Sequence, residues 1–260
     1  MNQGAVAIVT GASGGFGREF VKLLLSQADV SEVWAIARDE GKLKRLAAGS
    51  EGKVRVFPMD LSDRTCFAEI ERQLKQSHMP VKYLVNNAGF AKFCSYDDLS
   101  VGESLNMIDL NVGAVVALGL TCIPYMAKGG YIVNVASQAA FFALPYQNIY
   151  SSTKAFVRNY TRALNVELKD RQIHALAVCP GWMKTDLYHR AMIGAEKATR
   201  RFPAMATPDV VAEKALLDAQ KGKDISVYGL YVKFSHLLSK LTPQRLMMKI
   251  WLMQQGIKAE

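Results

Sequence analysis

The chain has 260 residues, which fits one large α/β domain, and a formal net charge of +9. The basic residues form no long run interleaved with aromatic residues, so we expect no nucleic-acid partner. The first residues do not have the pattern of a signal peptide and the four cysteines lie far apart, so we expect a cytoplasmic protein with free thiols and no metal site.

Seven short β-rich segments alternate with helical patterns along the chain. Strands are expected at AVAIVT, EVWAIA, VRVFPMD, KYLVNNA, GYIVNVAS, HALAVCPG and ISVYGLYV. Helices are expected over residues 16–28, 41–48, 64–76, 102–127, 150–169 and 208–221. Apolar strands alternating with helices predict a single α/β domain over residues 1–260, with a doubly wound (Rossmann-type) sheet of about seven parallel strands and helices on both faces. Ligands of such folds bind beyond the carboxyl ends of the strands.

The longest uncharged stretch covers residues 111–127 and contains two glycines and Pro124. A membrane-spanning helix needs about 20 predominantly apolar residues. We therefore expect a buried core helix here.

A glycine-rich segment, TGASGGFG at residues 10–17, joins the first predicted strand to the first predicted helix. Such a turn lets backbone amides approach a pyrophosphate at the helix N-terminus. The spacing of Gly11, Gly15 and Gly17 differs from the usual G-x-G-x-x-G fingerprint, so the prediction of a nucleotide site depends on the position of the loop.

Further motifs follow the glycine-rich segment in a fixed order. NNAG occupies residues 86–89, Ser137 precedes Y-x-x-x-K at Tyr150 and Lys154, and PGWMKT occupies residues 180–185. From Thr10 to about Thr185, this order resembles the short-chain dehydrogenase/reductase family, and the PGW variant is similar to its carbonyl reductase branch. The resemblance implies an oxidoreductase that moves a hydride between a nicotinamide cofactor and a carbonyl or alcohol without a metal.

The resemblance also implies a cofactor site. Its expected residues are Gly11, Ser13, Gly14, Gly15, Phe16, Gly17, Arg38, Asp60, Leu61, Asn87, Ala88, Gly89, Tyr150, Lys154, Pro180, Gly181, Met183 and Thr185. Arg38 ends the second predicted strand, where an arginine suits the 2′-phosphate of NADP and an acidic residue suits NAD. NADP (NADPH) is therefore the expected cofactor. NAD stays possible, because Asp39 is acidic and because this basic region could instead be the solvated face of the next helix. Asp60 has the alternative of capping the next helix.

Tyr150 and Lys154 are four positions apart and share one helix face. A tyrosine titrates near 10, and an ammonium about 4 Å from its phenolate would lower that pKa to near 7. We expect Tyr150 to act as a general acid. The resemblance implies that Ser137 hydrogen-bonds the substrate carbonyl, that Lys154 also holds the nicotinamide ribose, and that Asn111 anchors a water-linked proton relay.

Residues 186–207 occupy the place where the family has a mobile substrate lid. They include Tyr188, Met192, Phe202 and Met205. Together with Phe141, Phe142, Leu144, Trp182 and Met183, these side chains predict a pocket for a bulky apolar ketone or secondary alcohol. Ordinary core packing is the alternative for several of them.

Residues 234–260 form a predicted C-terminal extension of two amphipathic helices interrupted by Pro243. The extension could cover the substrate cleft, form an oligomer interface, or lie on a membrane surface with Lys240, Arg245 and Lys249 toward the headgroups. Packing on its own protein is favoured, and a membrane partner is not expected. Homodimers and homotetramers through the helices at residues 102–127 and 150–169 are common in the family.

A non-catalytic, dinucleotide-binding regulatory protein of the same fold is the alternative function. The intact Ser137, Tyr150 and Lys154 argue against it, because a sensor has no need of a proton donor.

Overall fold

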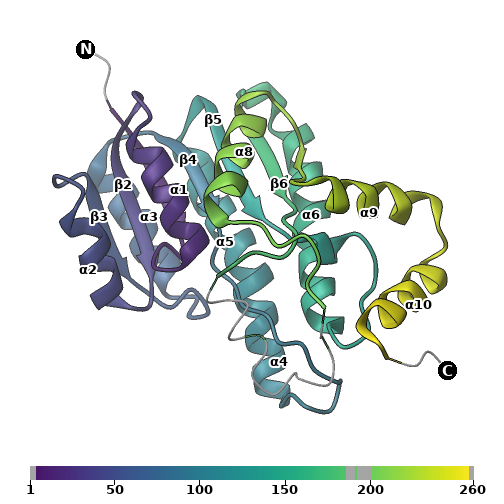
Figure 1. Ribbon diagram of the computed structural model, residues 1–260. Helices are drawn as coiled ribbons and strands as arrows, with labels where there is room; N and C mark the ends of the chain where they lie inside the picture. The colour runs from purple at the N-terminus through teal and green to yellow at the C-terminus, as the bar shows by residue number, and fades with distance from the viewer. Residues whose placement is uncertain (1–3, 186–190, 192–198, 200, 258–260) are drawn as a thin grey trace.

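The protein folds around one parallel β-sheet (Figure 1); the computed structural model describes residues 4–185, 191, 199 and 201–257. The strands lie in the order β3-β2-β1-β4-β5-β6-β7. Their bounds are β1 Ala5–Thr10, β2 Val30–Ala37, β3 Val54–Pro58, β4 Val81–Asn86, β5 Met126–Val135, β6 His174–Val178 and β7 Ile225–Ser226. All six neighbouring pairs are parallel, which confirms the predicted doubly wound sheet.

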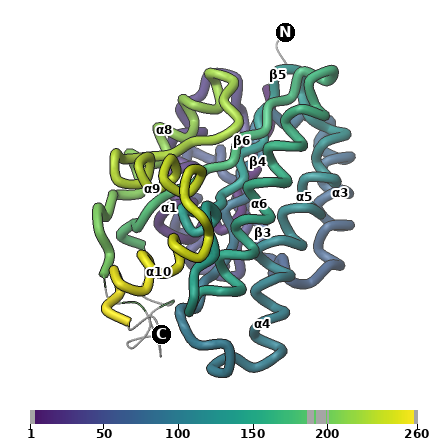
Figure 2. The backbone as a smooth tube through the Cα atoms, turned by 90° about the vertical axis from the view of Figure 1, so that its right-hand side faces the viewer, coloured from purple at the N-terminus to yellow at the C-terminus, as the bar shows by residue number. Residues whose placement is uncertain are grey.

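Helices cover both faces of the sheet, as Figure 2 shows with the sheet seen from one edge. One face carries α1 (Gly15–Leu25), α2 (Glu40–Ala48) and α8 (Pro208–Gln220), and the other carries α3 (Cys66–Ser77), α5 (Ala114–Cys122) and α6 (Asn148–Glu167). Alternate residues of β1 enter the two cores: Ala7 and Val9 face the first set of helices, and Val6 and Ile8 the second. This two-residue period explains why the strand sequences are apolar throughout.

The predicted helix at residues 102–127 is divided into several parts. It comprises α4 (Val101–Ile108), a π-helical turn (Asp109–Gly113), α5 and a 3₁₀ turn (Ile123–Tyr125), and Met126 already belongs to β5. The segment Val101–Tyr125 is long and apolar enough to cross a membrane, and its most apolar 18-residue window has a mean hydropathy of 1.7. The uncharged stretch at residues 111–127 was predicted to be too short to span a membrane. That prediction was wrong for the helical segment, because the segment begins ten residues before Asn111.

The same segment packs within the protein. Of its most apolar window, 44% is buried, and the α5 side chains Ala114, Leu118 and Cys122 contact the core between the sheet and α3. Burial against the sheet is what a core helix requires.

The last predicted strand, ISVYGLYV, was mostly wrong. Only Ile225–Ser226 pairs with β6, and α9 begins at Leu230. Gly229 has a φ of 83°, a left-handed conformation that ends the extended chain. Two helices do lie on either side of Pro243, namely α9 (Leu230–Leu241) and α10 (Gln244–Gln255), although the first starts before the predicted residue 234.

A buried polar chain fixes α6 on the sheet. The Asn86 amide donates to Asn134 Oδ1 at 2.8 Å, and the Asn134 amide donates to Thr161 Oγ1 at 2.9 Å. These bonds cross from β4 through β5 to α6. Because buried side-chain amides are costly to leave unpaired, they set the position of the helix that carries Tyr150 and Lys154.

Candidate active site

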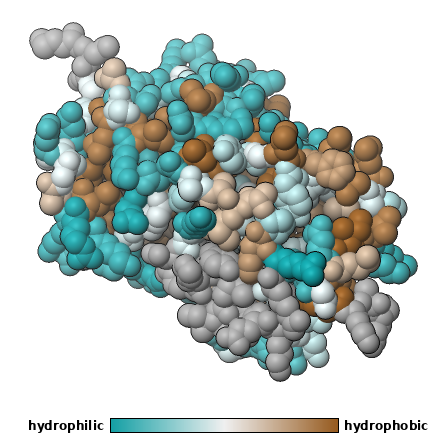
Figure 3. Space-filling view, in the orientation of Figure 1, coloured by the Kyte–Doolittle hydropathy of each residue, from teal (hydrophilic) through white to brown (hydrophobic). Residues whose placement is uncertain are grey.

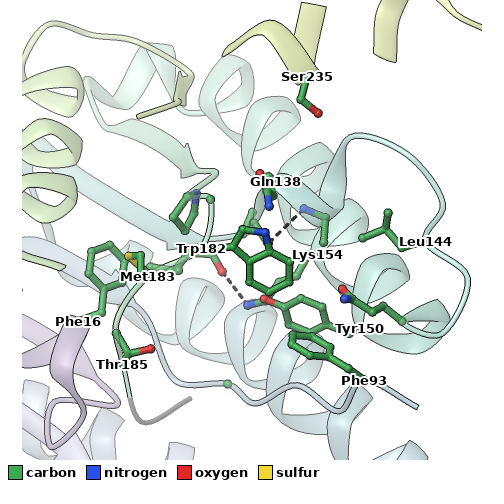
Figure 4. Close-up of a pocket in the computed structure, with 18 of the residues that line it drawn as sticks. Phe16, Phe93, Gln138, Leu144, Tyr150, Lys154, Trp182, Met183, Thr185 and Ser235 are labelled. Carbon is green, nitrogen blue, oxygen red and sulfur yellow. Dashed lines mark hydrogen bonds between the residues drawn. The ribbon is translucent and has the colours of Figure 1, made fainter. Parts of the chain in front are cut away.

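The site lies where the strand order reverses, between β1 and β4. The chain proceeds outward from β1 through β2 and β3, then returns to β4 on the other side. Loops at the carboxyl ends of β1, β4, β5 and β6 line one cavity with most of the predicted site residues (Figure 4). Those lining it are Gly11, Gly14, Gly15, Phe16, Gly17, Asn87, Ala88, Gly89, Ser137, Tyr150, Lys154, Pro180, Gly181, Met183 and Thr185. A crevice at this reversal is the usual ligand site of doubly wound sheets.

The glycine-rich loop leaves no room for side chains at two positions. Gly11 has a φ of 62°, and a Cβ there would lie 2.8 Å from Asn87 Nδ2. A Cβ on Gly17 would lie 2.3 Å from the carbonyl oxygen of Gly11. The described side chains provide no cap for α1 at Gly14, so the first amides of the helix remain available. Uncapped amides beside a bare backbone fit the pyrophosphate of a dinucleotide.

Thr10 holds the NNAG segment against the glycine-rich loop. Its Oγ1 accepts hydrogen bonds from the backbone amides of Asn87 and Ala88, both at 2.9 Å. The side-chain amide of Asn87 donates a hydrogen bond of 2.9 Å to the carbonyl oxygen of Thr10. Thr10 was not among the predicted site residues; its position at the end of a buried strand was the available signal.

Arg38 and Asp60 lie together at the exposed ends of β2 and β3. Arg38 Nη1 is 3.7 Å from Asp60 Oδ2. Asp39 is occupied as the cap of α2, since its carboxylate accepts from the Lys42 amide at 2.9 Å. That hydrogen bond lowers the pKa of Asp39. The Asp60 carboxylate also accepts from the Ser62 amide at 3.0 Å, in a turn before α3.

Four of the predicted cofactor residues do not line the cavity. They are Ser13, Arg38, Asp60 and Leu61. Leu61 is buried in the core between the sheet and α3, so its side chain contacts protein. Arg38 and Asp60 lie instead on an exposed surface at the edge of the site.

Ser137, Tyr150 and Lys154 are buried and come together from two elements. Ser137 follows β5, while Tyr150 and Lys154 lie one turn apart on α6. The Ser137 hydroxyl lies near enough to the Tyr150 phenol to lower the pKa of that phenol. Lys154 Nζ donates to the carbonyl oxygen of Val135 at 2.8 Å and lies 5.9 Å from the centre of the Tyr150 ring. This arrangement places a hydroxyl, a phenol and an ammonium at one end of the cavity.

Burial controls the ionisation of this group. It raises the pKa of Tyr150, and the nearby Ser137 hydroxyl opposes that effect only in part. It lowers the pKa of Lys154 to about 8. The predicted fall of the Tyr150 pKa to near 7 was therefore wrong for the protein without ligands. The reason is that desolvation disfavours the charged form of both groups.

Asn111 acts as a buried clamp. Its Oδ1 accepts from the Phe90 amide at 3.0 Å, and its Nδ2 donates to the Phe90 carbonyl at 2.9 Å and to Thr153 Oγ1 at 3.2 Å. The side chain joins the π-helical turn to the loop after β4 and to α6. It does not line the cavity, and the proton relay inferred for Asn111 remains an expectation.

The remainder of the cavity has apolar walls. Phe93 makes edge contacts with Tyr150 at 6.0 Å and with Trp182 at 5.7 Å between ring centroids, and Figure 4 shows these three rings side by side. Phe142, Leu144, Trp182 and Met183 line the cavity as predicted.

Other predicted pocket residues lie elsewhere. Phe141 is buried behind the cavity, where its ring stacks on His236 at 4.2 Å, so its assignment to the pocket was wrong. Phe202 packs edge-on against Trp182 at 4.8 Å. Tyr188 and Met192 lie outside the described residues, and Met205 is half-buried away from the cavity.

The C-terminal helices supply one wall of the cavity, which is one of the three uses considered for the extension. Phe234, Ser235, Leu238, Met247, Ile250, Trp251 and Gln254 line the cavity. Trp251 Nε1 donates to the carbonyl oxygen of Pro145 at 3.1 Å, which attaches α10 to the loop before α6. Gln138 and Gln147 also line the cavity and were not predicted to do so. They are close in sequence to Ser137 and Tyr150, respectively.

Comparison with known proteins agrees with this geometry. The sequence model for short chain dehydrogenases matches residues 5–193, so the chain belongs to the short-chain dehydrogenase/reductase family. It is 28% identical over 231 residues to an uncharacterized oxidoreductase of Staphylococcus aureus, covering 88% of this chain and 96% of the relative. It is 29% identical over 220 residues to the 3-oxoacyl-[acyl-carrier-protein] reductase of Thermotoga maritima, covering 82% and 89%.

A similar solved structure is that of a short-chain dehydrogenase from Sphingobium yanoikuyae in complex with NADPH. It superimposes with a TM-score of 0.77 at 26% identity, covering 98% of this chain and 99% of the other.

Proposed function

We propose that the protein is an NADP-dependent oxidoreductase that interconverts a bulky apolar ketone and its secondary alcohol. The observation that carries this proposal is the meeting of Ser137, Tyr150 and Lys154 in the same cavity as the glycine-rich loop. A regulatory protein that only binds a nucleotide would have no use for a buried phenol paired with a hydroxyl.

The residues divide the chemistry among them. A nicotinamide dinucleotide, when bound, supplies or accepts the hydride. The Ser137 hydroxyl donates a hydrogen bond to the substrate oxygen, and the Tyr150 phenol gives that oxygen its proton. The Lys154 ammonium stabilises the negative charge that develops on the phenol oxygen. In alcohol oxidation Tyr150 takes the proton back.

Two observations support NADP over NAD. Arg38 is exposed at the end of β2, where a ribose 2′-phosphate would bind, and Asp39 is engaged at the start of α2. The similar structure from Sphingobium yanoikuyae contains NADPH. Replacing Arg38 by Asp should weaken NADPH binding and strengthen NADH binding, which a fluorescence titration with each nucleotide measures. Equal loss with both nucleotides would argue against a 2′-phosphate contact.

The apolar walls support a bulky substrate. Phe93, Phe142, Leu144 and Trp182, together with Leu238 and Ile250, surround the space beside Tyr150. Burying apolar substrate surface against such walls is favourable. Loss of nucleotide absorbance over a panel of ketones tests the class: steroid or aromatic ketones should be reduced with lower KM than acetone.

We also propose a homodimer or homotetramer through α4, α5 and α6. Their outer faces expose Leu105, Ile108, Leu120, Phe156 and Val166. Exposed apolar faces of this kind are typical of subunit interfaces. Light scattering of the purified protein should give a dimer or tetramer mass, and Leu120→Glu should reduce it; a monomeric mass in the original protein would refute this part.

A further inference from the structure

The C-terminal helices expose an apolar stripe. On α9, Leu230, Phe234, Leu237 and Leu241 recur at intervals of four and three residues, so they share one face. Leu230 and Leu241 are 85% and 77% exposed. On α10, Leu246 and Met253 are also exposed. Figure 3 shows hydrophobic surface gathered at the right-hand side, where α9 and α10 lie.

The stripe lies in a strongly basic segment. From Ile225 to Ala259 the sequence contains no Asp or Glu. The basic residues of α9 and α10 are all exposed: Lys233, Lys240, Arg245 and Lys249. Within the described part of the chain, none of these four pairs with a carboxylate.

Helical geometry arranges the two kinds of side chain side by side. At 100° per residue, Lys233 and Lys240 lie along one edge of the α9 stripe, and the cavity-lining Leu238 lies along the other. Phe234 belongs to both regions, since it is exposed and lines the cavity. The apolar stripe is therefore continuous with the wall of the substrate cavity.

Arginine side chains of α6 add positive charge to the surface around α9. Burial and then the charges of Lys240, Arg158 and Arg162 lower the pKa of His236 on α9. Arg162 is paired with Asp224, whereas Arg158 lies over the Phe141 ring at 5.9 Å. The surface around α9 thus favours an anionic partner.

Charge distinguishes this surface from the proposed subunit interface. The α4 to α6 face includes Glu103, Asp109 and Glu167 as well as the arginines of α6, so its charge is mixed in sign. Two copies meeting through α9 and α10 would bring like charges together. A flat apolar stripe edged by unpaired cations matches the headgroup region of an anionic lipid membrane.

We propose that α9 and α10 dock the protein on the surface of an anionic lipid membrane, with the apolar stripe in the interface and the basic residues at the headgroups. Because Phe234 and Leu238 join the stripe to the cavity, an apolar substrate would enter from the lipid; this last step rests on the proposed function. Membrane docking itself does not depend on catalysis.

Cosedimentation with vesicles tests the docking step. The full chain should sediment with vesicles of phosphatidylcholine and phosphatidylglycerol, and remain in solution with phosphatidylcholine alone. Raising the salt concentration should release it, since exposed charges are screened. Equal binding to both vesicles, or to neither, would overturn the proposal.

Substitutions locate the contact. The double change Leu237→Glu and Leu241→Glu lies outside the cavity and should abolish sedimentation while leaving turnover in detergent-free buffer unchanged. Leu217→Glu on α8 is the matched control, because Leu217 is an exposed leucine on another element. Two results would show that the surface is not a membrane site. In the first, the double change leaves vesicle binding intact. In the second, the original protein binds no vesicles and the double change lowers the oligomer mass.

A second pair tests the charge. Lys233→Gln with Lys240→Gln should weaken vesicle binding by about 25-fold, at about fivefold for each cation near an anionic surface. Lys53→Gln with Lys128→Gln removes two exposed lysines beside β3 and in β5, away from α9 and α10, and should leave binding unchanged. Equal losses in the two pairs would mean that only the net charge matters, which contradicts a specific docking face.

Discussion

Lys154 Nζ donates a hydrogen bond of 2.8 Å to the carbonyl oxygen of Val135, so a buried ammonium joins the helix that carries Tyr150 to the end of β5. The bond positions the ammonium beside the phenol. Burial lowers the pKa of Lys154 to about 8, which means that the folded protein holds this proton less firmly than the unfolded chain does. The ammonium that serves the proposed reaction therefore makes the folded protein less stable at neutral pH.

This opposition predicts the effect of Lys154→Met. At neutral pH the buried ammonium costs about 3 kcal/mol, at 1.4 kcal/mol per pKa unit. Losing the bond to Val135 offsets about 1 to 2 kcal/mol of the gain. We therefore expect Lys154→Met to raise the free energy of unfolding by about 1 kcal/mol while turnover is lost. Urea unfolding measures it, and a variant that is less stable than the original protein would contradict the account.

The pH dependence of stability gives an independent check. Because the folded pKa of Lys154 is below its unfolded value of about 10.5, this residue binds a proton more readily in the unfolded chain between pH 8 and 10.5, and its own contribution to the stability should rise over that range. Lys154→Met should lack this rise. Lys154→Met, in which all other titrating groups are unchanged, should therefore melt above the original protein at neutral pH and below it near pH 10.5.

Carbonyl reduction should be fastest below about pH 8, the pKa of the Lys154 ammonium. Below that value the ammonium is charged, and Tyr150, whose pKa burial raises, still carries its proton. Above it the charge that stabilises the developing phenolate is lost. A profile of kcat/KM against pH with saturating nucleotide measures this, and a rate that keeps rising above pH 8 would show that Lys154 does not act in this way.

Alanine substitutions at Gly14 and Gly17, three residues apart in the glycine-rich loop, should change the stability by different amounts. A Cβ on Gly17 would lie 2.3 Å from the carbonyl oxygen of Gly11, whereas a Cβ on Gly14 would meet its nearest atom at 3.4 Å. We expect Gly17→Ala to destabilise the protein by about 1 to 3 kcal/mol. Gly14→Ala should change the stability by less than about 0.5 kcal/mol. Thermal unfolding compares the two variants, and equal losses would contradict the close packing of this turn.

Asn111→Ala should remove the clamp between the π-helical turn and the loop after β4. It leaves the amide and carbonyl of Phe90 without their side-chain partner, at a cost of about 2 to 4 kcal/mol. Asn106→Ala, at an exposed position on α4, is the control. If both variants unfold at the same urea concentration, Asn111 does not have the structural role described above.

The parts of the site that depend on backbone geometry could be predicted from sequence. Gly11, Gly17, Asn87 and the pair on α6 lie where the motif order places them, because strand ends and helix faces fix their positions. The fold was accessible for the same reason. The apolar strands and the helical spacing between them leave few other arrangements.

The failures arise where tertiary packing decides. Phe141 looked like a pocket residue but turns behind the cavity onto His236. Residues 230–232 were predicted as the end of a strand, yet they begin a helix that becomes a cavity wall, because Gly229 ends the extended chain. The Tyr150 pKa was predicted from its distance to a cation, whereas burial, which sequence does not give, dominates it.

The central claim is that Tyr150 supplies the proton for carbonyl reduction. The most direct measurement compares the original protein with Tyr150→Phe, first by nucleotide fluorescence titration and then by loss of nucleotide absorbance with a ketone that the original protein reduces. The account predicts the same nucleotide affinity in both proteins and a rate at least about 100-fold lower in the variant, the usual scale for a positioned general acid. Undiminished turnover in Tyr150→Phe would contradict it.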